Sequence, residues 1–289
     1  MSRTVKDYSS TEGKPNWCPG CGDFGIEMAM KQAMAQLDLD PDKVLLVSGI
    51  GCGANMPNWF STYGLITLHG RALPAATGAH LANHELSVFV EGGDGDGYGI
   101  GMGHFIHAMR RNPNMVYIVG NNTVYGLTKG QVSPTSAQGC KSPSTPFGNP
   151  DPPINPIALA LANHCSFVGR GYAGNLPHLV NLIKAAHDHK GFALVDVLQP
   201  CVTYAKDTGY KYYQDLTYDL QEAGHDKTDL EAAMKRAFEV PEKYPIGIFY
   251  EEERPLYEEE LPQFKKGPLA HHDISEIDIT PLFEEYQFA

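Results

Sequence analysis

The stretch from residue 86 to residue 131 constrains the fold more than any other part of the chain. Two apolar runs, 87–90 and 115–119, flank a segment with helical character over 98–111. Each run passes into a polar turn, Glu91 to Gly97 after the first and Gly120 to Asn122 after the second. This order of strand, turn, helix, strand and turn predicts a parallel βαβ unit. Its two turns should leave the same edge of one sheet, where open α/β sheets bind ligands.

The two turns carry oxygen atoms that suit Mg²⁺ bound to a diphosphate. Asp94 offers a carboxylate, Asn122 an amide oxygen and Val124 a backbone carbonyl. Mg²⁺ prefers six oxygen ligands, usually one or two carboxylates together with phosphates and water. The glycines beside Asp94 and the free N–H groups of the following helix would let a phosphate approach. Gly-Asp-Gly followed by Asn-Asn resembles the thiamine diphosphate motif, and an ordinary Asp-Gly turn between strands is the alternative.

The rest of the chain alternates between predicted strands and predicted helices. A chain of 289 residues can hold one large α/β domain, or such a domain with an extension. The alternation predicts an α/β fold with a parallel sheet and helices on both faces. The predicted strands are 44–48, 166–169 and 193–201, and the predicted helices are 26–37, 75–83, 157–163 and 176–190. We expect a flexible N-terminal arm over 1–16, a binding domain over 17–205 and an acidic C-terminal extension over 206–289.

Negative charge is concentrated in the predicted extension. Residues 206–289 hold 20 acidic and 9 basic residues, and so carry −11 of the formal charge of −12. This balance argues against a nucleic-acid partner, because nucleic acids are bound by basic surfaces. Apart from one helix over 229–240, we expect extended chain that docks on the domain or on a partner through apolar residues at 246–250 and 277–286.

The chain has no feature of a membrane or secreted protein. No apolar run approaches the ~20 residues of a membrane span, and the polar N-terminus lacks the apolar core of a secretory signal. We therefore expect a cytoplasmic protein, whose six cysteines should not form disulfides.

Four of the cysteines are placed to converge on the same edge of the sheet. Two form a Cys-x-x-Cys turn and the other two each follow a predicted strand; they are Cys18, Cys21, Cys52 and Cys201. A [4Fe–4S] cluster accepts such dispersed ligands, whereas structural zinc usually takes two local pairs. The spacing favours the cluster and leaves zinc open. Unliganded thiols are the remaining alternative, which fits Cys140 and Cys165.

Two loops near this edge could contribute to a site. His69 precedes a glycine at the predicted start of a helix, where it could contact a diphosphate or be purely structural. The long stretch 132–156 contains seven prolines and no regular pattern. A loop of that length is usually functional, for example as a lid.

Six motifs in order carry a family resemblance. They are Trp17-Cys18-Pro19-Gly20-Cys21-Gly22, Gly49-Ile50-Gly51-Cys52, Leu68-His69-Gly70-Arg71, Gly93-Asp94-Gly95-Asp96, Tyr125-Gly126-Leu127-Thr128-Lys129-Gly130-Gln131 and Gln199-Pro200-Cys201. Together they are similar to the beta subunit of 2-oxoacid:ferredoxin oxidoreductases, in particular the 2-oxoglutarate type. The resemblance covers roughly residues 15–265.

The resemblance implies a thiamine diphosphate-binding fold with two inorganic groups. Cys18, Cys21, Cys52 and Cys201 would bind one [4Fe–4S] cluster, which would decide between iron and zinc. Asp94, Asn122 and the Val124 carbonyl would hold Mg²⁺ against the diphosphate. The other expected cofactor contacts are Ile50, Gly51, Cys52, His69, Gly70, Gly93, Gly95, Asp96, Gly126, Leu127 and Thr128.

The resemblance also implies a reaction and its partners. A 2-oxoacid would lose CO₂ on thiamine diphosphate, two electrons would pass singly through the cluster to ferredoxin, and coenzyme A would receive the acyl group. The glutamate that faces the thiamine pyrimidine belongs to an alpha subunit in this family, so we expect an inactive chain when alone and an (αβ)₂ assembly.

The substrate is predicted less directly. Leu127 and Lys129 are candidate substrate contacts, and the cation favours 2-oxoglutarate over pyruvate or another 2-oxoacid. The alternative is a thiamine diphosphate decarboxylase without redox chemistry that carries a Cys₄ zinc site.

Overall fold

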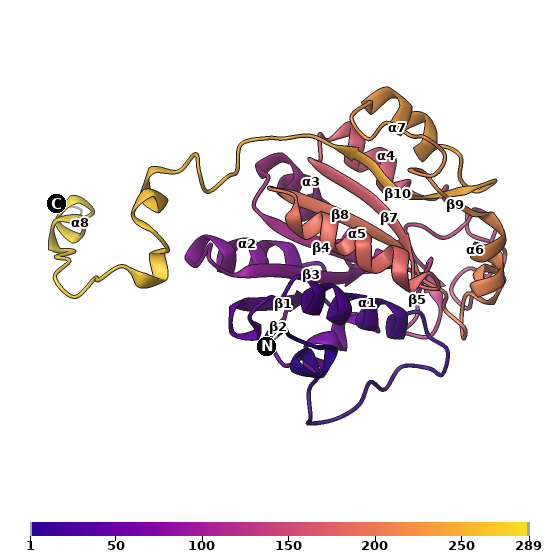
Figure 1. The fold of residues 1–289 in the computed structure, drawn as a ribbon, viewed down its shortest axis with the longest axis horizontal. Helices are drawn as coiled ribbons and strands as arrows, with labels where there is room; N and C mark the ends of the chain where they lie inside the picture. Colours follow the sequence, from indigo (N-terminus) through magenta and orange to yellow (C-terminus); the bar gives the residue numbers. More distant parts are fainter. Residues whose placement is uncertain (1, 288–289) are drawn as a thin grey trace.

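A computed structural model describes residues 2–287, which are organised around one eight-stranded sheet (Figure 1). Its strand order is β2-β1-β3-β4-β8-β7-β10-β9. The strands are β1 (Val44–Ser48), β2 (Tyr63–Ile66), β3 (Ser87–Gly93), β4 (Met115–Asn121), β7 (Phe167–Tyr172), β8 (Phe192–Leu198), β9 (Thr217–Asp219) and β10 (Tyr244–Glu251). The strands from β2 to β7 in this order are parallel, β10 is antiparallel to β7, and β9 is parallel to β10. The sheet is therefore mostly parallel, as the alternation predicted.

The central strands are buried on both sides, as expected for parallel strands covered by helices. Every residue of β1, β4 and β8 is buried. Successive side chains enter different cores: Leu45 and Val47 pack in one cluster, and Val44 and Leu46 pack in the other. These unbroken apolar runs are why the strands were recognisable in the sequence.

Helices cover the two faces of the sheet separately. The helices are α1 (Asp23–Gln36), α2 (Ala72–Ala82), α3 (Met102–Arg111), α4 (Pro156–Ala162), α5 (Leu176–Asp188), α6 (Tyr210–Leu216), α7 (Leu230–Ala237) and α8 (Thr280–Glu285). α1 packs against α5 on one face, and α2, α3, α4 and α7 contribute to the core of the other. No helix within residues 2–287 combines the length and apolar character needed to cross a bilayer.

The helix predicted over 98–111 is interrupted. Residues Gly95–Ile100 form a π-helical turn and α3 begins only at Met102. The Gly101 N–H donates to the Asp96 carbonyl at 2.8 Å, which closes the wider turn. Glycine has no side chain that could clash, so the glycines allow the backbone to adopt this wider turn. Such π-helical turns are frequent at functional sites.

Three short strands were not predicted from the sequence. β2 forms an exposed edge of the sheet beside β1. β5 (Val124–Tyr125) and β6 (Gln131–Val132) form a separate antiparallel pair. Strands this short depend on a pairing partner, so the local sequence does not reveal them.

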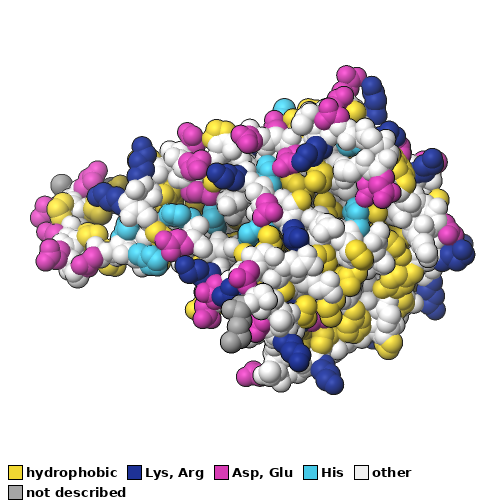
Figure 2. All heavy atoms as spheres, viewed as in Figure 1, with side chains coloured by type: hydrophobic (Ala, Val, Ile, Leu, Met, Phe, Trp, Pro, Cys, Tyr) yellow, Lys and Arg dark blue, Asp and Glu magenta, His cyan; other side chains and the backbone are white. Residues whose placement is uncertain are grey.

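The prediction of extended chain after residue 205 is wrong for 206–251. This part contributes α6 and adds β9 and β10 to the main sheet, whereas α7 confirms the one helix that was predicted, over 229–240. The boundary expected at 205/206 therefore falls inside the sheet. Residues 268–287, here called the C-terminal arm, project away from the sheet (Figure 1). Acidic side chains gather at the far end of the arm, around α8 (Figure 2).

The N-terminal segment is less free than predicted. Residues Val5–Tyr8 form a 3₁₀ turn, and the Tyr8 side chain is fully buried. Its hydroxyl donates to the carbonyls of Met34 at 3.0 Å and Leu39 at 2.5 Å. The expected flexible arm over 1–16 is thus anchored near the end of α1 through Tyr8, and its first residue lies outside the described residues.

Candidate active site at the carboxyl edge of the sheet

The parallel strands deliver the predicted site residues to one edge. β3 ends at Gly93 beside Gly120 of β4, and Asn121 of β4 pairs with Leu198 of β8. The next residues along each strand are Asp94, Asn122 and Gln199. Parallel register therefore brings together residues that are far apart in the chain.

Asp94 is buried at the start of the π-helical turn. Its Oδ2 accepts hydrogen bonds from Ser133 Oγ and Thr135 Oγ1, both at 2.5 Å. Burial raises the pKa of Asp94 to about 6, although both hydroxyls oppose the shift. A cation beside this carboxyl would restore its charged form, because an opposite charge lowers a carboxyl pKa. The chemistry of Asp94 therefore fits a divalent cation.

The Asn-Asn turn is held by a buried hydrogen-bond network. Asn121 Nδ2 donates to Asp196 Oδ1 at 3.1 Å, and Asp196 Oδ2 also accepts from Arg170 Nε at 3.2 Å. Asn122 Oδ1 accepts from the Val124 N–H at 3.1 Å. These hydrogen bonds hold the turn in place, and Asn122 and Val124 line the same pocket as Asp94.

Asp96 joins two loops to the π-helical turn. Its Oδ1 accepts from the N–H groups of Ile50 at 2.9 Å and Gly70 at 2.7 Å, and His69 Nδ1 lies 2.9 Å away. Burial raises the pKa of Asp96, and these donors oppose the shift. Gly70 has a φ of +73°, and a Cβ there would lie 2.6 Å from the Gly101 nitrogen. Gly70 therefore serves to let the loop pack on the π-helical turn.

One pocket collects the residues predicted to contact a cofactor. All of them except Gly70 line it: Ile50, Gly51, Cys52, His69, Gly93, Asp94, Gly95, Asp96, Asn122, Val124, Gly126, Leu127 and Thr128. Gly51 faces open space, because a Cβ there would meet no atom within 4 Å. Of the two candidate substrate contacts, Leu127 lines the pocket, whereas Lys129 lies on the exposed turn beside it and is not part of the wall.

The four predicted cysteines line a second, neighbouring pocket. All four are free thiols; Cys18 is exposed, Cys21 is buried, and Cys52 and Cys201 are half-buried. A Cβ on Gly126 would lie 3.5 Å from Cys52 Sγ and 3.9 Å from Cys201 Sγ, so both thiols border the Tyr125–Leu127 loop. The Trp17 indole donates to the Cys52 carbonyl at 2.6 Å and links the Cys-x-x-Cys segment to the Cys52 turn.

Two of the four thiols, Cys21 and Cys52, are poorly suited to stand alone as thiolates. Burial raises the pKa of Cys52 to about 12, and burial followed by the Asp23 charge raises the pKa of Cys21. Cys21 Sγ donates to Asp23 Oδ2 at 3.2 Å. A metal centre would stabilise the thiolates, and four cysteines around one pocket match in number and kind the ligands that a [4Fe–4S] cluster takes. Across residues 2–287 no three His, Cys, Asp or Glu side chains sit closely enough to hold a single ion.

Comparison with known proteins decides the family. Residues 49–197 match the model of the thiamine pyrophosphate enzyme C-terminal TPP-binding domain, and residues 201–266 match the model of the C-terminal part of the pyruvate ferredoxin oxidoreductase beta subunit. The chain is 44% identical to 2-oxoacid:ferredoxin oxidoreductase 1, subunit beta, of Aeropyrum pernix, over 99% of this chain and 95% of the relative. It belongs to the 2-oxoacid:ferredoxin oxidoreductase beta subunits. The resemblance drawn from the motifs is confirmed.

Two further relatives have more specific names. One is 2-oxoglutarate oxidoreductase subunit KorB of Mycobacterium tuberculosis, 45% identical over 68% of this chain and 52% of the relative. The other is the structure of 2-oxoglutarate:ferredoxin oxidoreductase from Magnetococcus marinus with 2-oxoglutarate, coenzyme A and succinyl-CoA bound. It superposes with a TM-score of 0.89 and 40% identity, covering 98% of this chain and 96% of that one. The beta subunit is therefore part of a thiamine diphosphate-dependent, coenzyme A-acylating enzyme.

Several residues of the beta-subunit site were not predicted. Ser133 and Thr135 come from the proline-rich loop, whose length alone signalled a function. Glu91 lines the first pocket and is buried, and its Oε2 has no hydrogen-bond partner among the described residues. Its position directly before the glycines was the only signal available in the sequence. Gln199 also lines this pocket and donates to Cys21 Sγ at 3.8 Å.

Proposed function

We propose that this chain binds thiamine diphosphate, Mg²⁺ and one [4Fe–4S] cluster, and that with an alpha subunit it oxidatively decarboxylates 2-oxoglutarate to succinyl-CoA. One observation carries this proposal. The pocket around Asp94 and the pocket of the four cysteines share part of their walls, namely Cys52, Asn122, Gly126 and Leu127. A cofactor in the first pocket would therefore lie next to a redox centre in the second.

The first pocket would bind Mg²⁺ and the diphosphate, and the second would bind the cluster. Asp94, Asn122 and the Val124 carbonyl would hold Mg²⁺, with Ser133 and Thr135 orienting the Asp94 carboxyl. Cys18, Cys21, Cys52 and Cys201 would hold the cluster. When bound, thiamine diphosphate supplies the carbon chemistry of decarboxylation and the cluster accepts electrons one at a time. Asp96 positions the Ile50 and His69 loops around that chemistry through the hydrogen bonds to Ile50 and Gly70.

The missing half of the site defines the partner. Neither pocket wall contains a lysine or an arginine from the described residues. Most cationic contacts for a dicarboxylic substrate would therefore come from the alpha subunit, and the family resemblance implies that the glutamate facing the thiamine pyrimidine comes from it as well. We infer an (αβ)₂ assembly that passes electrons to ferredoxin and acyl groups to coenzyme A.

The choice of 2-oxoglutarate rests on the named relatives and on Lys129. Lys129 is exposed beside the pocket wall, on the turn where its φ is +79°. In the assembled enzyme it would reach the distal carboxylate of 2-oxoglutarate, which pyruvate lacks. Pyruvate is the second candidate, because residues 201–266 match a pyruvate ferredoxin oxidoreductase model.

The decisive experiment uses the beta chain co-expressed with its alpha subunit and purified without oxygen. We expect broad visible absorption, about four irons and four sulfides per beta chain, and bleaching when 2-oxoglutarate and coenzyme A are added. Cys52→Ser should lose the iron and the absorption. Cys140→Ser is the matched control, because Cys140 lies outside both pockets. Zinc without a chromophore would instead support a non-redox decarboxylase.

Substrate choice is tested by comparing kcat/KM for 2-oxoglutarate and pyruvate with a dye as electron acceptor. We expect 2-oxoglutarate to be preferred, and Lys129→Met to reduce kcat/KM for 2-oxoglutarate about tenfold more than for pyruvate, because one charge-assisted contact is lost. Preference for pyruvate would overturn the substrate assignment and leave the cofactor assignment standing.

A further inference from the structure

Three segments that line the cysteine pocket, or adjoin residues that line it, each carry a lysine. They are residues 13–20, 126–131 and 201–206. Each carries one lysine and no aspartate or glutamate, and the lysines are Lys14, Lys129 and Lys206, here called the cationic rim. Residues 1–205 carry a formal charge of only −1, and residues 206–289 carry −11, so the rim is a small basic site on a chain of net charge −12.

The three segments converge in space. Asn16, Leu127 and Tyr204 all line the cysteine pocket, and each stands two residues from a rim lysine. A Cβ on Gly130 would lie 2.9 Å from Tyr204 Cδ1, so the turn that carries Lys129 packs on the segment that carries Lys206.

The rim lysines are exposed, and their side chains form no ion pair within the described residues. By contrast, Lys31, Lys211, Lys227 and Lys235 are paired with acidic side chains. Glu12 and Asp207 flank two of the segments, and both are exposed. The rim charges are therefore available to a partner.

The centre of the same surface is apolar. Leu127 is 55% exposed and Tyr204 is 44% exposed, and Phe24 packs edge-on against Trp17 beside the Cys-x-x-Cys turn. An apolar centre with a charged rim is typical of protein–protein contact surfaces. Cys18, the one exposed thiol of the four, lines the cysteine pocket. A protein that docks here would therefore come as near to the proposed cluster as the outer surface allows.

We propose that the cationic rim is the docking surface for a small acidic protein that carries a one-electron centre. The inference rests on the proposed cluster and names the surface through which its electrons leave. Positive charge at the exit would overcome the repulsion between an acidic carrier and an acidic enzyme, and would raise the rate of encounter. Such electron-transfer contacts bury little surface, about 1,200 Å² or less, so a few charges contribute a large share of the binding.

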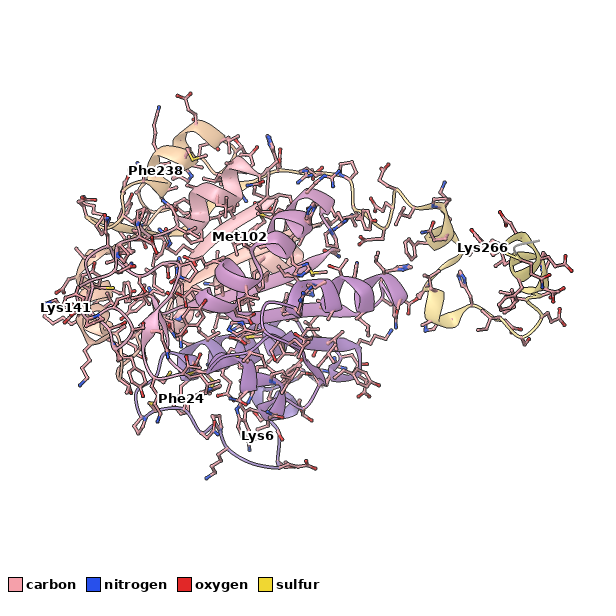
Figure 3. All side chains as sticks on the ribbon, turned by 180° about the vertical axis from the view of Figure 1, so that it is seen from behind. Lys6, Phe24, Met102, Lys141, Phe238 and Lys266 are labelled. Carbon is pink, nitrogen blue, oxygen red and sulfur yellow. The ribbon has the colours of Figure 1, made fainter. Side chains whose placement is uncertain are left out.

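The test uses the holoenzyme with its alpha subunit and two electron acceptors, a purified acidic ferredoxin and methyl viologen. The variant is Lys14→Glu combined with Lys206→Glu; Lys129 is left intact because it is a candidate substrate contact. Lys266→Glu is the matched control. Lys266 is exposed on the C-terminal side, and Figure 3 shows it at the far end of the molecule from Phe24.

We expect the double variant to raise KM for ferredoxin roughly tenfold and to flatten its dependence on salt, with methyl viologen reduction unchanged. Lys266→Glu should change neither reaction. An unchanged KM for ferredoxin with full viologen reduction would overturn the docking surface alone. If the double variant no longer formed the alpha–beta complex on size exclusion, the rim would be a contact with the alpha subunit. That result would also overturn the proposed docking surface. A wild-type enzyme that reduces neither acceptor would overturn the proposed function and, with it, the docking surface.

Discussion

The pKa values of acidic side chains are shifted in opposite directions at the carboxyl edge of the sheet and on the C-terminal arm. Burial raises the pKa values of Glu91, Asp94 and Asp96 at the edge. On the arm, hydrogen bonds from Ser275 and Thr280 lower the pKa values of Asp273 and Asp278, which are exposed. Most of the net charge lies after residue 205, yet the chemistry lies with the few carboxyls that the fold removes from water.

The comparison also separates two uses of acidic residues. An exposed carboxylate is hydrated and contributes mainly to solubility and long-range electrostatics. A buried carboxyl is held near neutrality or pairs with a cation, and so it can bind and position ligands. Four predictions test this contrast, in decreasing order of expected effect.

The largest effect should come from Asp94→Ala. Loss of the only carboxylate in the proposed Mg²⁺ site should weaken thiamine diphosphate binding by at least roughly 100-fold, measured by calorimetry with Mg²⁺ present. Asp278→Ala on the arm is the matched control and should bind normally. Equal binding by both variants would mean that Asp94 is not a cofactor ligand.

Glu258 joins the two regions, because it anchors the chain just before the arm. Its Oε1 lies 2.7 Å from His80 Nε2, and both side chains are buried. Burial acts to raise the pKa of Glu258, but the hydrogen bond and the charge of His80 outweigh it and hold the pKa below its usual range.

Glu258→Ala should reduce the free energy of unfolding by about 2 kcal/mol, because His80 is left buried without a partner. Urea unfolding measures this, and faster tryptic cleavage at Lys265 and Lys266 should accompany it. Glu258→Gln keeps an acceptor for His80 and should lose less. A variant as stable as wild type would show that the pair does not hold the arm to the body.

Glu91→Gln should change how stability depends on pH in the cofactor-free protein. Burial, then the Asp23 and Asp96 charges, raise the pKa of Glu91 well above its usual value. Its contribution to stability is therefore full below the unfolded pKa, near ~4.3, and is lost as pH rises through the folded pKa.

Wild type should thus lose stability between pH 5 and pH 8, and Glu91→Gln should lose less, as measured by urea unfolding at both values. Glu276→Gln, an exposed change on the arm, should leave the wild-type slope intact. An identical slope in Glu91→Gln would mean that Glu91 is already ionised in the folded protein.

The smallest effect should come from ending the chain after Gly267. The arm buries little: Ile274, Ile277 and Phe283 are all more than half exposed. Its removal should therefore change the free energy of unfolding by less than about 0.5 kcal/mol. A larger loss, seen as a clear fall in Tm, would show that the arm packs on the body in solution.

Prediction from sequence succeeded where the local pattern and the tertiary environment agree. The apolar runs 87–90 and 115–119 are buried strands of β3 and β4, and the polar turns after them face one pocket. It failed where partners decide the structure. β9 and β10 are strands because an edge of the sheet was free beside β7; the apolar residues at 246–250 indicated docking, but not that they would pair as a strand.

The sequence by itself determined the family resemblance, the mostly parallel sheet and the candidate cysteines and cofactor contacts, but not pocket residues such as Glu91 and Gln199. Motif spacing and strand periodicity carry that information locally. Only the tertiary structure decided that Ser133 and Thr135 hold Asp94, that Glu91 is buried with one oxygen unpartnered among the described residues, and that the two pockets share a wall. Ser133 and Thr135 lie 39 and 41 residues from Asp94, and Cys201 lies farther still. Burial and hydrogen bonding across such separations arise only when the strands pair in register.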